Sequence, residues 1–163
     1  MKKYLTPAAL LMCIVLLFTA CSLPTREYSC GEMTLTLPVD FADVFAGAED
    51  MGDLEFYFAN RDIAITGLHE SKEEVWGYFP GISTEDYARI VMESLEAEDT
   101  LVQRDGLWTF TFLDDVDDAW DTCTVVIHET DTHFWLLQAN CRSSHYDAMK
   151  DAIWQYLSGA TFQ

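Results

Sequence analysis

Residues 122–141 read TCTVVIHETDTHFWLLQANC. Two runs rich in β-branched and aromatic residues, 122–129 and 133–141, flank the polar link Thr130-Asp131-Thr132, and this arrangement predicts a β-hairpin. The second run contains Phe134-Trp135-Leu136-Leu137, so large apolar side chains occupy both faces of that strand. An antiparallel sheet with one face in solvent would be polar on that face. The hairpin therefore predicts a sheet that is covered on both sides.

Further strands are predicted on the N-terminal side of this hairpin. Apolar and polar residues alternate from Met33 to Leu37, and Pro38 ends the run. Two more hairpins are predicted from composition and turn signals, namely 54–59 with 63–68 around Asn60-Arg61-Asp62, and 100–103 with 107–113 around Arg104-Asp105-Gly106. Together these runs predict an antiparallel sheet of about six or seven strands.

Two amphipathic helices are predicted to cover this sheet. Ser83 has the N-cap position of the first, with Glu85 and Asp86 in its first turn. The second helix begins at Ser144, which with Asp147 resembles a capping box, and Gly159 ends it. The apolar stripes are Tyr87, Ile90, Val91, Ser94 and Leu95 in the first, and Tyr146, Met149, Ile153, Tyr156 and Leu157 in the second. Because burial on two sides needs two covering layers, the fold class is predicted as α+β, an α/β/α sandwich with helices on both faces.

The N-terminal residues have the features of a secretory leader. Lys2 and Lys3 precede the apolar run 10–18, which is too short to span a bilayer permanently. Leu17-Phe18-Thr19-Ala20-Cys21 then resembles the lipobox of bacterial lipoproteins. In that motif the cysteine is diacylated and becomes the first residue of the mature protein. The resemblance implies a removed signal peptide, 1–20, and a lipid on Cys21.

This leader predicts where the chain resides and how it is divided. We expect a tether, 21–29, that carries the lipid on Cys21, followed by a single globular domain, 30–163. Two acyl chains are sufficient for stable attachment to a bilayer. The chain is therefore expected at the cell membrane, lipid-anchored and facing the extracytoplasmic side.

The charge of the chain excludes one class of partner. The formal net charge is −19, and removal of Lys2 and Lys3 with the leader makes it more negative still. Without a basic surface, the chain is not expected to bind nucleic acid. An acidic domain is also repelled by anionic lipid, so membrane attachment is expected through the lipid on Cys21 alone.

The order of the predicted elements resembles a known family. It comprises the strand Thr34-Leu35-Thr36-Leu37-Pro38, a strand pair, one helix, a meander of strands, and a closing helix before Thr161-Phe162. This order, over about residues 30–163, is similar to the PsbP-like α/β/α sandwich. That family includes extrinsic proteins of photosystem II, a Ran-binding nuclear-import factor and many bacterial lipoproteins. The resemblance implies a binding or assembly role, with no catalytic residue and no cofactor.

Three cysteines remain in the domain after Cys21. The hairpin register that we predict pairs Glu129 with Trp135 and Cys123 with Cys141, which places the two cysteines opposite each other. A Cys123–Cys141 disulfide is therefore predicted, with a bridge from Cys30 to either one as the alternative. The odd number leaves one thiol free or paired with another chain.

The acidic run 114–121 is the first of two candidate metal sites. It contains Asp114, Asp115, Asp117, Asp118 and Asp121, and closely spaced carboxylates suit Ca²⁺. The run lacks the glycine and the final glutamate of an EF-hand loop, so a solvated acidic loop is the alternative.

The second candidate is the tip of the last hairpin, with His128, Glu129, Asp131 and His133. Imidazoles with carboxylates could bind Zn²⁺. His128 and His133 converge only if the turn is distorted, so exposed histidines without a metal are expected instead.

The segment 76–81, Trp-Gly-Tyr-Phe-Pro-Gly, is predicted to be an aromatic loop. Exposed aromatic residues are enriched at binding surfaces, which makes Trp76, Tyr78 and Phe79 binding candidates. The alternative is that Trp76 and Phe79 fold back and cover the edge of the sheet.

The sequence lacks several common enzyme motifs. The sequence has no Gly-x-Ser-x-Gly, no phosphate-binding glycine loop and no His-Glu-x-x-His. We therefore expect a non-catalytic binding or assembly module for an envelope protein. The alternative is a binder of a small ligand or divalent metal through the acidic loop 114–121 or the aromatic loop 76–81.

Overall fold

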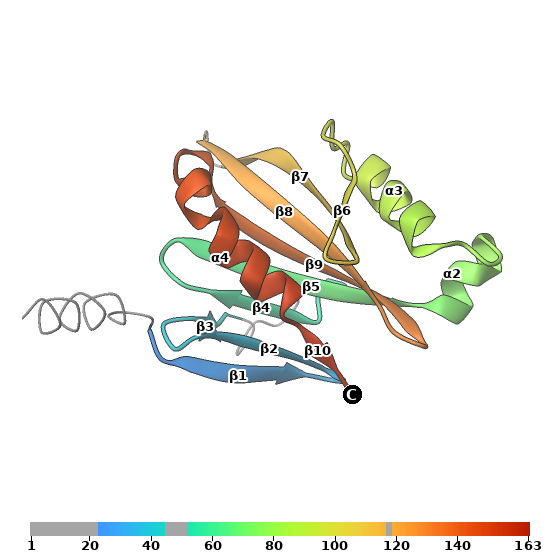
Figure 1. Cartoon of the computed structure of the whole chain (residues 1–163), viewed down its shortest axis with the longest axis horizontal. Coiled ribbons are helices and arrows are strands. Elements are labelled where there is room, and N and C mark those ends of the chain that lie inside the picture. The colour runs from blue at the N-terminus through green and yellow to red at the C-terminus, as the bar shows by residue number, and fades with distance from the viewer. Residues whose placement is uncertain (1–22, 45–51, 117–118) are drawn as a thin grey trace, which may run out of the picture.

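Seven antiparallel strands form the central sheet of the molecule (Figure 1). The computed structural model describes residues 23–44, 52–116 and 119–163. Within them the strands are β1 (Thr25–Cys30), β2 (Met33–Pro38), β3 (Ala42–Asp43), β4 (Phe56–Ala59), β5 (Ile63–Ser71), β6 (Val102–Arg104), β7 (Leu107–Val116), β8 (Ala119–Glu129), β9 (His133–Arg142) and β10 (Thr161–Phe162). The α-helices are α2 (Lys72–Tyr78), α3 (Thr84–Ser94) and α4 (Tyr146–Ser158), and the 3₁₀ turn η1 (Ser143–His145) precedes α4.

The central sheet has the strand order β3-β4-β5-β9-β8-β7-β6. Its long strands are neighbours: β5 pairs with β9 from Ile63–Cys141 to Ser71–His133, and β8 pairs with both β9 and β7. A second sheet of three strands, in the order β1-β2-β10, lies beside it. The predicted antiparallel sheet and its size are therefore confirmed.

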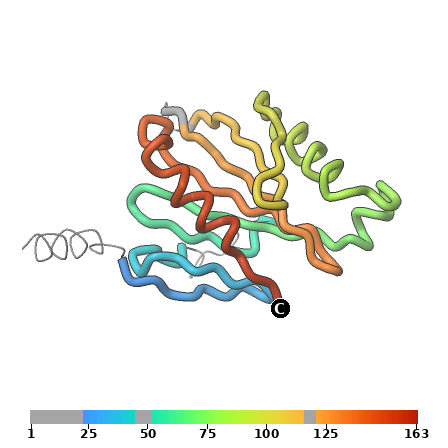
Figure 2. Tube along the Cα trace, in the orientation of Figure 1, coloured from blue at the N-terminus to red at the C-terminus, as the bar shows by residue number. Residues whose placement is uncertain are grey.

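Two hydrophobic cores lie on the two faces of the central sheet. On one face α4 and the three-stranded sheet share a core with β4, β5 and β9, in which Met33, Trp135 and Leu157 are fully buried. On the other face α2 and α3 pack through Val75, Tyr87 and other residues against β7, β8 and β9. Figure 2 shows the chain passing from one layer to the other, with α4 on one side of the strands and the α2–α3 pair at the right of the view. This arrangement confirms the α+β class with helices on both faces.

Local signals in the sequence account for several of these elements. Asp105 and Gly106 both have positive φ, 50° and 87°, as a tight turn between β6 and β7 requires. The side chain of Ser83 caps α3 by accepting a hydrogen bond from the backbone N–H of Asp86. Asn60 Oδ1 accepts hydrogen bonds from the backbone N–H groups of Asp62 and Ile63, and these bonds close the β4–β5 turn.

Two boundaries differ from the prediction. The stretch 21–29 was predicted to be a tether, but residues from Thr25 onward form β1 and pair along their length with β2. The predicted capping box is also wrong, because Ser144 lies in η1 and His145 at the N-cap of α4 makes no side-chain cap. The leader 1–20 and Cys21 lie outside the described residues.

The predicted cysteine pairing is wrong because the hairpin register differs by one residue. Glu129 is opposite Phe134, so Cys123 is opposite Asn140 and Cys141 is opposite Thr122. A shift of one residue turns a side chain to the other face of the sheet. Cys123 and Cys141 therefore point to opposite faces. These two cysteines and Cys30 are free thiols, and Cys30 donates a hydrogen bond to the carbonyl of Glu55.

Candidate functional site

Helix α2 displays three exposed aromatic side chains at one end of the molecule. Trp76 is 44% exposed, Tyr78 83% and Phe79 49%. We call these three residues the aromatic corner. The segment was predicted to be a loop, but Trp76 and Tyr78 lie in a helix, and the backbone N–H of Phe79 closes its last turn on the carbonyl of Val75. Trp76 and Phe79 are each about half covered by neighbouring residues, and the remaining surface of each ring is open to solvent.

The aromatic corner is exposed because α2 is fixed to the sheet by other residues. Val75 is buried in the core beneath the helix. The backbone N–H of Lys72 donates to the carbonyl of Thr132 at 2.8 Å, and Lys72 Nζ lies 2.6 Å from Glu129 Oε1. Thr84 Oγ1, at the start of α3, donates to Glu129 Oε2. Hydrogen bonds from Lys72 and Thr84 hold the pKa of Glu129 below its ordinary value.

Hollows adjoin the aromatic corner on both sides of α2. A groove of about 530 Å³ runs between α2 and the β8–β9 turn. Its lining includes Glu73, Trp76 and Asp131. A smaller hollow of about 160 Å³ lies between α2 and α3 and is lined by Glu70, Glu74, Val75, Tyr78, Phe79, Tyr87 and Ile90. Aromatic side chains beside concave surface are typical of binding sites.

Tyr87 forms the floor of the smaller hollow. Its ring is stacked on Phe134 with centroids 4.3 Å apart, and its hydroxyl donates to Glu70 Oε2 at 2.5 Å. Burial and the neighbouring carboxylate raise the pKa of Tyr87. The raised pKa favours the neutral hydroxyl, and the stacked ring and the hydrogen bond fix Tyr87 in the floor of the hollow.

The acidic segment is a continuation of two strands. Asp114 is opposite Asp121 and Asp115 is opposite Trp120, because β7 extends to Val116 and β8 begins at Ala119. Consecutive acids therefore alternate between the two faces of the sheet. Arg142 Nη1 lies 3.1 Å from Asp121 Oδ1.

Asp117 and Asp118 lie outside the described residues. In the parts of the chain that the structure describes, no three histidine, cysteine or carboxylate side chains are arranged to hold a metal ion.

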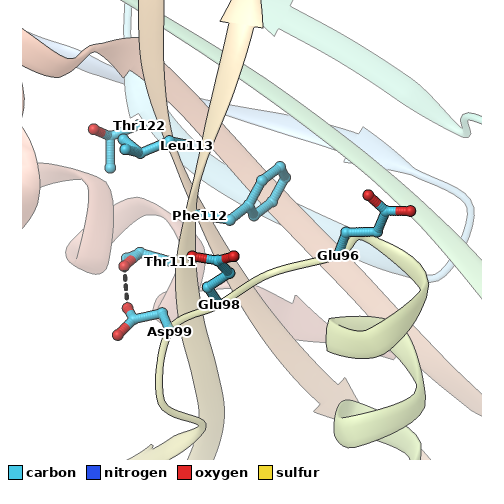
Figure 3. A pocket seen from close by; sticks show the side chains of 7 residues that line it. All are labelled: Glu96, Glu98, Asp99, Thr111, Phe112, Leu113 and Thr122. Carbon is cyan, nitrogen blue, oxygen red and sulfur yellow. Dashed lines mark hydrogen bonds between the residues drawn. The ribbon is translucent and has the colours of Figure 1, made fainter.

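Another acidic hollow, which the sequence did not indicate, lies at the far end of α3. It has a volume of about 500 Å³ and is lined by Glu96, Glu98, Asp99, Thr111, Phe112, Leu113 and Thr122 (Figure 3). Figure 3 shows the three carboxylates on the connection that follows α3, facing the side chains of β7. Thr111 Oγ1 donates to Asp99, and this hydrogen bond holds the pKa of Asp99 below its ordinary value.

The histidines predicted at the hairpin tip lie on the same face of the sheet but in different surroundings, since His128 is opposite Trp135 and His133 is two residues before Trp135 on β9. His128 is buried, and its Nε2 lies 2.8 Å from the carbonyl of Leu157 at the end of α4. Burial lowers the pKa of His128, which favours the neutral ring. The expectation of an exposed His128 is therefore wrong.

His133 contacts groups that sequence spacing could not reveal. Its ring centroid lies 4.6 Å from that of His69, and its Nδ1 lies 3.3 Å from Glu32 Oε1. Trp135 Nε1 donates to the same Glu32 oxygen at 3.1 Å. This cluster joins the β1–β2 turn to the central sheet: His69 reaches it because β5 pairs with β9, and Glu32 reaches it through side-chain contacts from the separate three-stranded sheet.

Solved structures of other proteins have a fold similar to this one. No family model and no curated protein sequence matches the chain. Among solved structures, cyanobacterial PsbP (CyanoP) from Synechocystis sp. PCC 6803 matches with a TM-score of 0.58 and 11% identity, over 88% of this chain and 98% of that one. The fold is PsbP-like.

Two further solved structures are similar to the chain. LpqN of Mycobacterium tuberculosis, a protein involved in cell envelope biogenesis, has a TM-score of 0.51 at 11% identity, over 86% of both chains. A protein of Bacteroides thetaiotaomicron has a TM-score of 0.55 at 14% identity, over 85% of this chain. The present chain spans about half of that protein, 48% of its length.

At identities of 11–14%, these structural similarities show the fold alone. None of the helices in the described part of the chain combines the length and apolar character needed to cross a bilayer.

Proposed function

We propose that this chain is a lipid-anchored, extracytoplasmic binding module that has no catalytic activity and docks an envelope protein on its aromatic corner. The observation that carries this proposal is the exposure of Trp76, Tyr78 and Phe79 together on one short helix and its C-cap. Large aromatic side chains give much contact area at low entropic cost, and they are enriched in the energetically dominant part of protein interfaces.

The lipid anchor is supported by the lipobox-like sequence Leu17-Phe18-Thr19-Ala20-Cys21. An envelope location is compatible with the structural similarity to LpqN, which is described as involved in cell envelope biogenesis. The proposal that the module is non-catalytic is supported by the lack of a recognised nucleophile motif or metal-binding motif in the sequence.

The position of the aromatic corner fits an anchored module. The start of β1, which follows the predicted attachment point, and helix α2 lie at opposite ends of the long axis of the molecule (Figure 1). A lipid on Cys21 would therefore leave the aromatic corner away from the anchored end, where a partner protein could reach it.

A comparison of variants tests the docking surface. The immobilised mature domain is incubated with detergent-solubilised envelope, and the retained proteins are quantified by mass spectrometry. A partner should be retained by the wild type and lost with Trp76→Ala, Tyr78→Ala and Phe79→Ala combined. Val39→Ser with Leu113→Ser is the matched control, since both side chains are exposed and apolar but distant in the sequence from α2. Equal retention by all three proteins would contradict the proposal.

The anchor has its own test. Mass spectrometry of the N-terminal peptide from membranes should find Cys21 as the first residue with acyl chains attached, and Cys21→Ala should release the domain from the membrane fraction. An unmodified Cys21 in a membrane-bound wild type would contradict lipid anchoring.

A second candidate function is binding of a small ligand, and the hollow in Figure 3 favours it. Its volume of about 500 Å³ would admit a small molecule. Such a ligand should raise the melting temperature, because it binds only the folded chain. A thermal-shift screen with small molecules and Ca²⁺ tests this alternative, and a shift abolished by Asp99→Asn would assign the ligand to this hollow.

A further inference from the structure

We propose that the aromatic corner recognises a basic segment of its partner, in which lysine or arginine side chains alternate with apolar ones. This inference rests on the proposed docking function and names the chemistry of the partner. It depends on how charge is distributed around α2.

Two carboxylates on α2 have no partner in the described residues. The side chains of Glu73 and Glu74 are exposed, and neither makes a hydrogen bond or ion pair with a residue that the structure describes. Glu73 lines the groove beside Trp76, and Glu74 lines the hollow beside Tyr78 and Phe79. Each side of the aromatic corner therefore combines an aromatic face with an unneutralised carboxylate.

A third unpaired carboxylate faces α2 across the groove. Asp131, in the β8–β9 turn, lines the same groove as Trp76 and likewise makes no ion pair with a described residue. Carboxylates on both sides of a groove create a negative potential that attracts a cationic ligand.

The cations near the aromatic corner are already engaged within the fold. Lys72 is buried and lies 2.6 Å from Glu129. Arg89 Nη2 lies 2.6 Å from Glu85 Oε1, one turn earlier in α3. Because Lys72 and Arg89 are both already paired, a cationic partner would be needed to neutralise Glu73 and Glu74.

The fold itself shows that this chemistry accommodates a cation. Lys72 Nζ lies 5.3 Å from the ring centroid of Phe134 and 5.9 Å from that of Trp76, with Glu129 as its counter-ion. That combination of aromatic faces and a carboxylate binds an ammonium group beneath α2. The hollow between α2 and α3 brings Tyr78 and Phe79 beside Glu74, and no cationic side chain in the described part of the chain lines it.

A second copy of the chain fits this surface poorly. The formal charge of −19 makes two copies repel each other, and the carboxylates at the aromatic corner would meet another acidic surface. A basic segment relieves that repulsion and gains cation–π contacts with the exposed rings.

The test is a titration of the full mature domain with a synthetic probe. A fluorescent peptide of alternating lysine and leucine is compared with one of alternating glutamate and leucine, at about 0.15 M salt, where the screening length is roughly 8 Å. The protein variants are Tyr78→Ala, Glu73→Gln with Glu74→Gln, and Glu96→Gln with Glu98→Gln. The last pair removes the same charge at the opposite end of α3 and is therefore the matched control.

The proposal expects binding of the lysine peptide alone. It also expects an affinity loss of about tenfold with Glu73→Gln and Glu74→Gln, and a comparable loss with Tyr78→Ala. The control pair should change the affinity by less than about twofold, because Glu96 and Glu98 line a different hollow, which none of the three aromatic residues lines. Circular dichroism on each variant excludes unfolding as the cause.

Three outcomes would overturn the inference. The first is an equal loss of affinity in the two double glutamate variants, which would assign binding to the overall charge. The other two are binding of the glutamate peptide, and binding of neither peptide. None of them affects retention of an envelope protein through the aromatic corner, so a failure of this inference and a failure of the docking proposal give different results.

Discussion

Lys72 Nζ lies 2.6 Å from Glu129 Oε1, so the first residue of α2 is tied to the last residue of β8. The two ends of this ion pair have unequal environments. The Lys72 side chain is 10% exposed and the Glu129 side chain 44%. The pair therefore holds the helix that carries the aromatic corner, and its two members should respond differently to substitution.

Glu129→Gln should destabilise the protein more than the double variant with Lys72→Met. The single change leaves a buried ammonium group without its counter-ion, at a cost of about 1–3 kcal/mol. The double change replaces the ammonium with an apolar side chain of similar length and removes that cost. Urea unfolding of the wild type, both single variants and the double variant measures the coupling. If the loss of stability in the double variant equalled the sum of the losses in the two single variants, the two residues would not interact.

The same pair predicts a pH dependence. The folded state holds the pKa of Glu129 below its ordinary value of 4.5 through hydrogen bonds from Lys72 and Thr84. A lowered folded-state pKa means that the stabilisation is fully present above the ordinary value and is lost as the pH falls through the lowered one. The stability difference between wild type and Glu129→Gln should thus be constant above about pH 5 and shrink below pH 4.5. A difference that grows on acidification would contradict this assignment.

Tyr78→Ala should leave the stability nearly unchanged. The side chain is 83% exposed, and substitutions at such positions usually change the free energy of unfolding by less than about 0.5 kcal/mol. Val75→Ala, in the same helix, is the control, since burying a valine side chain is worth about 1.5–3 kcal/mol. Thermal unfolding of both variants checks the difference. A large loss of stability with Tyr78→Ala would place that ring in the core and remove it as a docking residue.

The three cysteines of the domain should remain reduced in the folded protein. Cys123 and Cys141 lie on opposite faces of the sheet, and burial raises the pKa of Cys123 to about 12. Native alkylation at pH 8 should therefore leave both unmodified, whereas alkylation in denaturant should label both and Cys30 as well. Mass spectrometry of the non-reduced protein gives the count. A cross-linked peptide containing Cys123 and Cys141 would show that the register described above is incorrect.

Elements with a local cause were predictable from the sequence. The β4–β5 hairpin follows from the Asn60 side chain that closes its turn, and α3 follows from the Ser83 cap. The β6–β7 turn follows from Asp105-Gly106, which tolerates positive φ. The cover on both faces of the sheet was predictable because large apolar side chains lie on both faces of β9. Each of these signals acts within a few residues of the chain.

Features that depend on distant contacts were not predictable. The register of the last hairpin was also missed, although its cause is local: Thr130 Oγ1 accepts hydrogen bonds from the backbone N–H groups of Thr132 and His133, and composition alone does not show such a turn. Residues 25–30 form a strand because β2 pairs with them, although they carry few apolar residues. The exposure of the aromatic corner depends on the anchoring of Lys72 by Glu129, which lies far along the chain.

Gly67→Ala should be strongly destabilising. A Cβ atom at this position would lie 2.3 Å from a ring carbon of Phe56 and 3.0 Å from Leu137 Cδ2. Overpacking of this kind costs about 1–3 kcal/mol. Phe56→Leu combined with Gly67→Ala should recover part of the loss relative to the two single variants, as measured by urea unfolding. Strictly additive effects would contradict the close packing of β4 on β5.

Photo-crosslinking in intact cells tests the docking role of the aromatic corner most directly. A photoreactive phenylalanine analogue replaces Tyr78 in one strain and Val39 in another, two exposed positions, of which only Tyr78 belongs to the aromatic corner. The account predicts a discrete adduct with one envelope protein from position 78, reduced by Glu73→Gln with Glu74→Gln, and no such adduct from position 39. The same adduct from both positions, or none from position 78 in a correctly anchored protein, would contradict it.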